Sequence, residues 1–379
     1  GRDTEYLKAP SDALRAGCRA LWENERVVPI ALRRAHMIAY VLDHAQVSAR
    51  PFEYFADQLR HDGIPMEITR AFCRSLRPAL EDVLAKSSAA VHCRALTGEG
   101  DFGHTCPDWR ALLTLGYPGI LARLRNARAL NRAPEQAQFY DAGICVYEAL
   151  LRLLSRLAEA AQRCGGIHGS VMAENLRALS VRAPQTFHEA LQLSTLTLWL
   201  QSGVEGAVVR SLGRFDLLYQ PFFERDLRSG RFSEAELLEL LRYYLYRWNA
   251  ANIEANVPLT MGGTAQGEPD AFSDFARTVF SVYGELSIIS PKIHLRCTAD
   301  TPEAILSQPL DLIRKGTNSI VLCNDEVVVP SLMRLGETRE DACDYVMVGC
   351  YESTSMGREV ACTCNGRISF PKAVEYAMT

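Results

Sequence analysis

The sequence of 379 residues has no long uninterrupted hydrophobic run. Its apolar stretches, such as 190–200, are interrupted by Gln and Thr and are shorter than the roughly 20 residues that a membrane-spanning helix requires. The chain also does not open on a signal-peptide pattern. We therefore expect a cytoplasmic protein with no membrane partner.

An excess of charge of one sign is also missing. Lys and Arg together number 41, and Asp and Glu together number 45. This balance creates no strong single-sign field that would attract nucleic acid or an anionic membrane surface. We therefore expect no nucleic-acid partner, and we expect the substrate to be a small molecule.

The sequence lacks a compact cysteine framework. Its twelve cysteines are scattered along the chain, which is typical of reduced thiols in the cytosol rather than of secreted disulfides. Four of them, Cys343, Cys350, Cys362 and Cys364, have six, eleven and one residues between them. This spacing matches no common zinc or iron–sulfur motif, so we expect no bound metal.

Helical periodicity dominates the first half of the chain. Apolar residues recur at the three-to-four spacing of one helix face over 29–44, and residues 150–163 and 186–200 behave the same way. Residues 101–109 interrupt this pattern with glycine, histidine and proline, which predicts a loop between two helices. A polar loop within a helical region is a candidate pocket wall, and His104 belongs to this loop.

The second half of the chain has a different hydrophobic pattern. Short apolar runs at 288–295, 319–322 and 345–348 alternate with helical patterns at 302–315 and 330–335. Strands that alternate with helices indicate a parallel sheet with crossover helices, so we assign the chain to the α/β class. Reactive groups in such folds lie on loops at the carboxyl ends of strands.

The tetrapeptide Gly349-Cys350-Tyr351-Glu352 follows the last of these apolar runs. In an extended loop, residues two apart project to the same side, so the Cys350 thiol and the Glu352 carboxylate could reach one substrate. Glycine before the cysteine permits a tight turn or a close backbone approach. These residues alone leave open a buried structural cysteine, which is the commoner role of a free thiol.

A longer run around this tetrapeptide resembles a known family. Residues 324–352 are similar to the segment of the glycyl radical enzymes that approaches their active-site cysteine. Further motifs agree in order from about residue 101 to the end, while the first hundred residues match only loosely. These motifs are Gly103-His104, Asp108, Gly116, Thr186-Phe187-His188-Glu189-Ala190-Leu191-Gln192, Ser211-Leu212-Gly213-Arg214-Phe215-Asp216, Pro221-Phe222 and Phe370-Pro371-Lys372-Ala373-Val374-Glu375.

The resemblance implies a fold and a set of site residues. The fold is a ten-stranded β/α barrel of two antiparallel five-stranded parallel half-barrels, wrapped by helices, with the cysteine on a central finger loop. Residues 1–379 would form one catalytic barrel domain, which we expect to be incomplete, with a helical part at 1–100 and the barrel core at 101–379. Cys350 would carry the thiyl radical, and Glu352 would transfer protons.

The resemblance also implies substrate-binding positions. Residues His104, Ser211 and Thr363 match family positions on the substrate side, although a loop histidine bonded to backbone remains an equal alternative for His104. Val209 falls where several dehydratases have a polar residue, which implies a more apolar pocket.

The subfamily follows from residues around the cysteine. Gly349 in place of a second cysteine argues against acyl transfer, and Glu352 indicates the dehydratases, the lyases and the arylacetate decarboxylases. Arg358 replaces a lysine of the hydroxyproline dehydratase and arylacetate decarboxylase branch. Cys364 replaces a carboxylate of the diol dehydratases, which argues against glycerol or propanediol as the substrate.

The Arg-Val-x-Gly-aromatic signature of the radical glycine is missing. The pair Arg26-Val27 leads only to Val28-Pro29. The resemblance implies a glycyl radical cofactor, on a glycine outside this chain, that a radical S-adenosylmethionine activase installs. We therefore expect the chain to be inactive by itself, as a shortened enzyme, as a split enzyme that needs a C-terminal glycyl radical domain or subunit, or as a degenerate homologue.

The leading functional hypothesis is a glycyl radical lyase that eliminates water, an amine or a similar group from a small organic molecule. The alternatives are a radical arylacetate decarboxylase and a non-catalytic or split-enzyme subunit. The expected partners are the small-molecule substrate and the radical-activating enzyme, and the resemblance leaves a homodimer open.

Overall fold

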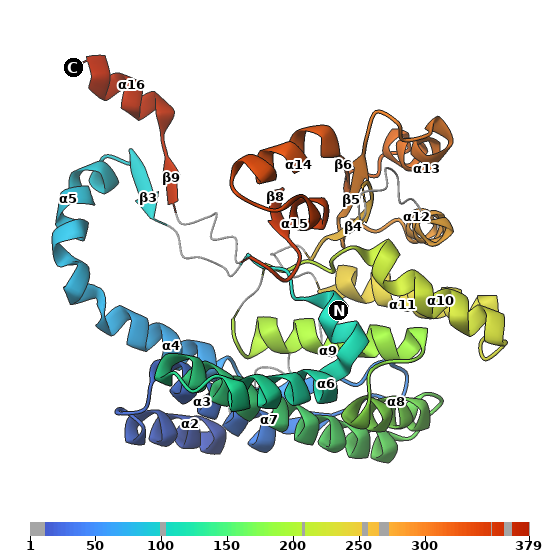
Figure 1. The fold of residues 1–379 in the computed structure, drawn as a ribbon, viewed down its shortest axis with the longest axis horizontal. Coiled ribbons are helices and arrows are strands. Elements are labelled where there is room, and N and C mark those ends of the chain that lie inside the picture. Colours follow the sequence, from blue (N-terminus) through green and yellow to red (C-terminus); the bar gives the residue numbers. More distant parts are fainter. Residues whose placement is uncertain are drawn as a thin grey trace.

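The structure is a computed structural model that describes residues 12–98, 104–206, 209–251, 257–264, 273–349, 351–359 and 366–378. These residues form a helix-rich α/β fold, which confirms the predicted fold class. A layer of long helices lies along one side, and a small parallel sheet with its own helices lies on the other (Figure 1). No helix in the described part is both long and apolar enough to cross a bilayer.

The helical layer contains the elements predicted from apolar periodicity. The expected helices at 29–44, 150–163 and 186–200 are confirmed as α3, part of α7 and α9. The Thr186 side chain accepts a hydrogen bond from the Glu189 amide and so caps the first turn of α9. The helices of this layer are α2 (Asp12–Asn24), α3 (Ile30–His44), α6 (Trp109–Leu130), α7 (Pro134–Cys164), α8 (Gly169–Val181) and α9 (Phe187–Gly203).

Three parallel strands form the sheet. They are β4 (Leu259–Gly262), β5 (Ile293–Cys297) and β6 (Ile320–Asn324), hydrogen-bonded in that order. Isolated parallel bridges join Thr105 to Arg210 and Arg214 to Thr260, so the pairing continues beyond β4 through two further segments. The loop at 104–106 therefore lies at one end of an array of five segments that run in the same direction.

Four helices connect or flank these strands. They are α10 (Phe215–Ser229), α11 (Glu234–Ala251), α12 (Asp274–Leu286) and α13 (Glu303–Arg314). The sequence prediction of a helix at 302–315 between two strands is confirmed by α13 between β5 and β6. Sequence periodicity missed β4, because Leu259–Gly262 is too short to show a period.

The third predicted strand is not part of the parallel sheet, which corrects the sequence-based topology. β7 (Tyr345–Val348) pairs antiparallel with β8 (Glu352–Ser355) in a hairpin that we call the finger hairpin. The Met347 amide donates to Thr260 Oγ1 of β4 at 3.3 Å, so the hairpin packs against the sheet. A four-residue apolar run fits a sheet strand or a hairpin equally well, and here β8 is an immediate partner.

Two helices lead into the finger hairpin. α14 (Asp325–Arg334) begins directly after β6, where Asn324 caps it by accepting a hydrogen bond from the Glu326 amide. The sequence predicted only its last turns, at 330–335. The short α15 (Arg339–Cys343) then returns the chain to β7.

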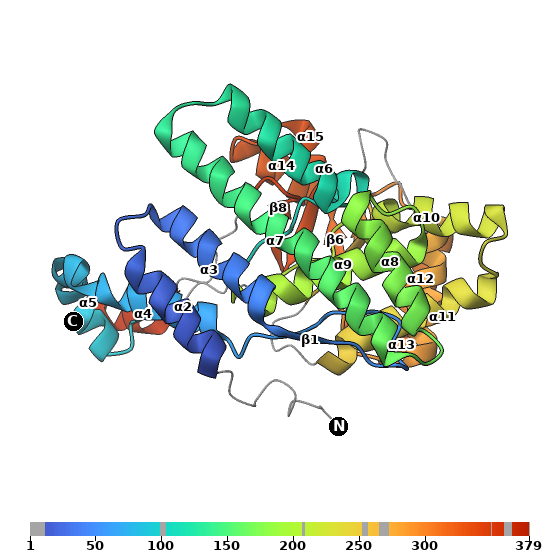
Figure 2. The same cartoon turned by 90° about the horizontal axis from the view of Figure 1, so that it is seen from below.

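The remaining elements lie away from the sheet. Figure 2 shows α4, α5 and the C-terminal helix together beyond the N-terminal helices. The remaining elements are β1 (Gln46–Ser48), β2 (Gln58–Arg60), α4 (Ile64–Ser75), η1 (Arg77–Leu80), α5 (Glu81–His92), β3 (Leu96–Gly98), β9 (Gly366–Ile368) and α16 (Phe370–Met378).

The predicted ten-stranded barrel stays a prediction, because the described residues contain the three-stranded sheet and only short two-stranded pairs besides it.

Candidate active site

The tip of the finger hairpin turns at Gly349. This residue has a φ of +61°, a left-handed conformation that glycine adopts without steric cost. Cys350, the predicted radical cysteine, lies outside the described residues, as does Thr363. The neighbours of Cys350 on both sides are described, and they define the surroundings of the tip.

Glu352 begins β8 directly after the tip. One carboxylate oxygen, Oε2, accepts a hydrogen bond from the Tyr351 amide at 3.0 Å. The other, Oε1, lies 3.8 Å from Nε2 of His104. This distance is longer than a hydrogen bond, yet it is short enough for both side chains to contact the same small group.

His104 reaches the finger hairpin from the loop that sequence reasoning selected. Its side chain is 5% exposed, whereas that of Glu352 is 19% exposed. The loop is held by the Thr105 amide, which donates to the Val209 carbonyl at 3.4 Å, and by the Thr105 hydroxyl, which donates to the Glu359 carbonyl at 3.2 Å. The loop is therefore fixed to the sheet on one side and to the chain after β8 on the other.

Packing around Gly349 joins these groups into one site. A methyl group at this position would lie 2.8 Å from Val209 Cγ1 and 3.0 Å from both Glu352 Oε2 and His104 Cδ2. Such distances are shorter than normal contacts, so a methyl group would fit only if these side chains shifted. Residues from the loop at 104, the segment at 209 and the finger hairpin therefore meet at the tip.

Ser211, a predicted substrate-binding residue, lies two positions after Val209, and its hydroxyl is already engaged. The side chain is fully buried, its Oγ donates to the Pro258 carbonyl at 3.3 Å, and it accepts from the Gly213 amide at 3.1 Å. The first bond joins the segment at 209–214 to the chain just before β4, and the second holds the backbone at Gly213. The structure thus brings His104 and Glu352 together and engages the Ser211 hydroxyl in main-chain contacts.

Sequence reasoning missed two residues near the tip, His294 and Lys292. The Tyr351 ring lies edge-on to the ring of His294, with 6.3 Å between centroids, and Lys292 Nζ lies 5.3 Å from the Tyr351 centroid. The available signal was the alternation in β5, where Ile293 and Leu295 are apolar and the residues between and after them are polar. Such alternation separates a core face from a site face.

No group of three or more His, Cys, Asp or Glu side chains in the described ranges could hold a metal ion. Cys343 is buried, and the other three cysteines of the cluster considered from the sequence lie outside these ranges. The described groups that meet at Gly349 are therefore the Glu352 carboxylate, the His104 imidazole and the apolar Val209, with Tyr351, His294 and Lys292 nearby.

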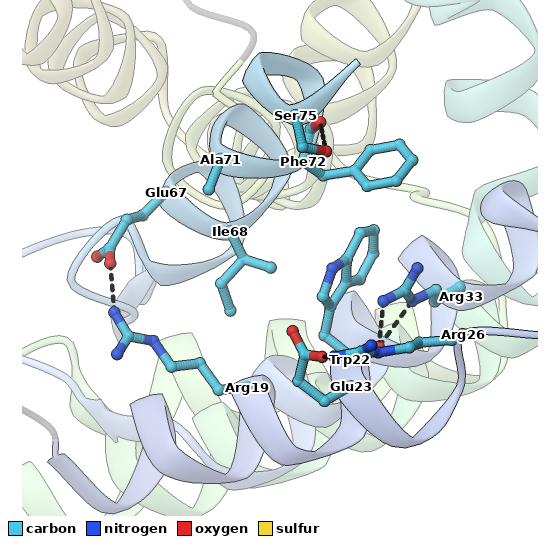
Figure 3. Close-up of a pocket in the computed structure, with 10 residues that line it drawn as sticks. All are labelled: Arg19, Trp22, Glu23, Arg26, Arg33, Glu67, Ile68, Ala71, Phe72 and Ser75. Atoms are coloured by element: carbon cyan, nitrogen blue, oxygen red, sulfur yellow. Dashed lines mark hydrogen bonds and ion pairs between the residues drawn. The ribbon is translucent and has the colours of Figure 1, made fainter. Parts of the chain in front are cut away.

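A separate groove of about 740 Å³ lies between α2 and α4 (Figure 3). Its charged side chains already have partners within it. Arg19 pairs with Glu67 at 2.8 Å, and Arg33 stacks on Trp22 at 3.7 Å while donating to the Trp22 carbonyl. The finger residues do not line it, so we place the active site at the hairpin tip.

Comparison with known families identifies the group of proteins to which the chain belongs. The family model described as PFL-like, Pyruvate formate lyase-like, matches residues 68–379, which include the finger hairpin and the loop at His104. The chain belongs to the pyruvate formate lyase-like family of glycyl radical enzymes. The family predicted from the sequence motifs is therefore confirmed, and the match extends into residues 68–100, where those motifs were weak.

Individual relatives of this pyruvate formate lyase-like chain are distant. It is 27% identical to (2S)-3-sulfopropanediol dehydratase of Klebsiella oxytoca, in an alignment that covers 73% of this chain and 37% of the relative. It is 25% identical to isethionate sulfite-lyase of Bilophila wadsworthia, over 72% of this chain and 36% of the relative. The chain thus spans little more than a third of these proteins.

The fold is also shared with solved members of the family. A glycyl radical enzyme from Archaeoglobus fulgidus superposes with a TM-score of 0.80 at 20% identity, over 99% of this chain and 58% of that one. This likeness concerns the fold. The pyruvate formate lyase-like chain therefore has the arrangement of sheet and helices found in part of a larger enzyme.

Proposed function

We propose that this chain is the cysteine-loop part of a glycyl radical lyase that eliminates water, an amine or a similar group from a small organic substrate. The observation that carries the proposal is the position of Glu352 Oε1 at 3.8 Å from His104 Nε2, directly beside the Cys350 tip. A proton-transfer pair next to a hydrogen-abstracting sulfur is what an elimination requires.

The chemistry is divided among three residues of the tip. A glycyl radical, when the complete enzyme holds one, supplies the unpaired electron that Cys350 needs. The Cys350 sulfur takes a hydrogen atom from a substrate carbon that bears a hydroxyl or amino group. Glu352 accepts the proton of that group and delivers a proton to the leaving group on the next carbon, which departs as a neutral molecule. The remaining product radical takes the hydrogen atom back from the Cys350 thiol, and His104 orients the substrate.

The surroundings of the tip suit these roles. Tyr351, beside Cys350, is 62% exposed, so the tip is open to a further segment that could bring the radical glycine close. Val209 is 6% exposed and packs on the opposite side, which gives the substrate carbon chain an apolar wall. Relatives that are a dehydratase and a sulfite-lyase support elimination as the reaction class.

The proposal extends to the complete enzyme. The five parallel segments from 105 to β6 would be one half of a ten-stranded barrel, with the finger hairpin inside it. A C-terminal glycyl radical domain or subunit and a radical S-adenosylmethionine activase would be its partners in the cytoplasm. Ser211 would shape the substrate side of the pocket through its hydrogen bonds to Pro258 and Gly213, and Thr363 would contact the substrate.

The test uses the complete enzyme, activated anaerobically, with electron paramagnetic resonance to detect the glycyl doublet and mass spectrometry to detect products. Cys350→Ser should abolish turnover and leave the thermal midpoint unchanged, whereas the exposed Cys73→Ser should keep both. Appreciable turnover by the Cys350 variant contradicts the proposal. Carbon dioxide release from an arylacetate would identify a decarboxylase instead, and the absence of any doublet would identify a non-catalytic subunit.

A further inference from the structure

A buried ion pair lies beneath the base of the finger hairpin. Arg296 is fully buried in β5, and Asp325 at the start of α14 is 3% exposed. The two side chains form parallel hydrogen bonds, from Nε to Oδ1 at 2.9 Å and from Nη2 to Oδ2 at 2.7 Å. This bidentate geometry fixes the plane of the guanidinium group.

The same guanidinium binds the start of β7. Its Nη1 donates to the Cys343 carbonyl at 2.9 Å and to the Tyr345 carbonyl at 3.0 Å. The Tyr345 ring lies 3.9 Å from the guanidinium carbon, and the Tyr345 hydroxyl donates to Asp325 Oδ1 at 2.7 Å. The main chain and the side chain of Tyr345 are therefore both attached to the pair.

A second arginine extends these contacts to β4. Arg214 Nη2 donates to the Gly262 carbonyl at 2.7 Å, and Nη1 donates to the Cys343 carbonyl at 3.3 Å. Asp325 Oδ2 also accepts from the Thr264 amide at 2.8 Å. The base of the finger hairpin is thus bonded to the carboxyl ends of two neighbouring strands.

The charge state of this cluster is maintained by its own geometry. Burial by itself would raise the pKa of Asp325, but the bonds from Arg296 outweigh burial, and the pKa is lowered. Burial likewise opposes the charge of Arg296, and the bonds to Asp325 outweigh it and raise the pKa of the guanidinium. Both groups therefore stay ionised at neutral pH.

A buried ion pair is a poor source of net stability, because the cost of removing two charges from water offsets most of their attraction. Its hydrogen bonds are directional, however, and they define one position of the groups they bind. In a hairpin this matters, because a shift of one residue turns every side chain to the opposite face. Such a shift in β7 would move the tip residues away from His104 and Val209.

We propose that the Arg296–Asp325 pair, together with Tyr345, is a positioning device that sets the register of the finger hairpin and so places Gly349 and Glu352 against His104. Its catalytic meaning rests on the proposed lyase function, whereas its structural effect does not. Arg296, Asp325 and Tyr345 are positioning residues, because they act on the tip through β7.

The test replaces the pair by apolar residues in the variant Arg296→Met/Asp325→Leu and measures amide hydrogen exchange by mass spectrometry. Exchange over 346–349 and 351–356 should accelerate about tenfold or more, while exchange in α9 and the thermal midpoint stay close to wild type. The matched control is Arg247→Met/Asp57→Leu, a buried ion pair between α11 and the chain before β2. It should leave exchange in the finger hairpin unchanged.

Tyr345→Phe is the milder second variant and decides the question if the double variant does not fold. It removes only the hydroxyl bond to Asp325, and we expect exchange in the finger hairpin to accelerate about threefold. Wild-type exchange rates in the hairpin of every folded variant would overturn the inference.

Failure of the lyase function is a separate outcome. A loosened hairpin in an activated enzyme that converts no substrate supports the positioning device and rejects only the proposed function. In an active enzyme, Tyr345→Phe should lower kcat with little change in KM, since it displaces the tip rather than the substrate. An unchanged kcat alongside a loosened hairpin would overturn the catalytic part of the inference.

Discussion

The helical layer and the finger region are built on different interactions. The core of the helical layer is apolar, with fully buried leucines such as Leu153, Leu157 and Leu176 from α7 and α8. The finger region combines apolar side chains, of which Val346 and Val348 belong to the main core, with buried charged groups such as Arg296 and Asp325. Burial of apolar surface has no direction, whereas an ion pair with shared hydrogen bonds does.

We therefore expect the helical layer to determine the free energy of unfolding and the finger region to determine the position of the hairpin tip. Removing a leucine from the helical layer should lower the free energy of unfolding and leave the tip geometry as it is. Replacing the ion pair of the finger region should alter the tip and cost less stability, because the cost of removing two charges from water offsets most of the attraction in a buried pair. Four substitutions test this separation, and they are ordered by the size of the expected effect.

In the finger region, the substitution Glu352→Gln should have the largest effect. It keeps the shape of the side chain and removes the proton acceptor, so kcat of the activated complete enzyme should fall by about two to four orders of magnitude. The thermal midpoint should stay within a few degrees of wild type. The exposed Glu340→Gln is the control and should change neither quantity. A kcat close to wild type would show that Glu352 transfers no proton.

Leu157→Ala is the corresponding test of the helical layer. Leu157 is fully buried in α7, and truncation of such a side chain costs about 2–5 kcal/mol of the free energy of unfolding. Urea unfolding followed by circular dichroism measures this loss. Leu130→Ala, at a position 84% exposed, should cost less than about 0.5 kcal/mol. Accelerated exchange in the finger hairpin of Leu157→Ala would show that the two regions are coupled.

His188→Gln tests how the stability of the helical layer depends on pH. Burial is the main reason why the pKa of His188 is lowered to about 4, and its Nε2 contacts the Tyr54 carbonyl at 2.8 Å. The unfolded chain has a histidine pKa near 6.5, so neutral His188 stabilises the fold above this pH, and that stability is lost as the pH falls towards 4. The loss is on the order of 3 kcal/mol.

Glutamine cannot take up this proton, so the variant should have a flatter dependence of unfolding free energy on pH between about 6.5 and 4. The exposed His44→Gln serves as the control and should keep the wild-type dependence. Equal slopes for wild type and His188→Gln would mean that this histidine does not contribute to acid unfolding.

Gly349→Ala has the smallest expected effect on stability. Gly349 and Gly230 share a positive φ, but a methyl group at Gly230 would have no neighbour within 4 Å. Gly230→Ala therefore reports the backbone cost, about 1 kcal/mol, and Gly349→Ala should cost about 1 kcal/mol more because of the contact with Val209. The added substitution Val209→Ala should remove part of this difference. Equal costs at the two glycines would contradict the tight packing of the tip.

Much of the fold was accessible from local patterns. The helix α3 follows from apolar residues at helical spacing, and α9 begins at Thr186, a residue type that caps helices. The run at 345–348 was recognised as a strand, yet its partner was not, because four apolar residues carry no information on pairing. β4 was missed for the same reason, since its neighbours β5 and the segment at 214 are distant in sequence.

The candidate site also has some features that the sequence predicted and others that only the structure showed. The motif around Glu352 and the loop at His104 were identified from residue types and their order, and both assignments of role remain predictions. Their proximity, the engagement of the Ser211 hydroxyl by Pro258 and Gly213, and the Arg296–Asp325 pair under the finger hairpin came only from the folded chain. Apart from the bond between Ser211 and Gly213, these contacts join residues that are far apart in the sequence.

The sequence by itself determined the family, the α/β class, the main helices and the tetrapeptide to which we assign the reactive cysteine and carboxylate. Such features depend on periodicity and on short motifs, which neighbouring residues contain in full. Only the tertiary structure decided that β7 belongs to a hairpin and that Glu352 lies beside His104. Pairing and register depend on contacts between segments far apart in the chain, and their energy exists only once those segments have packed together.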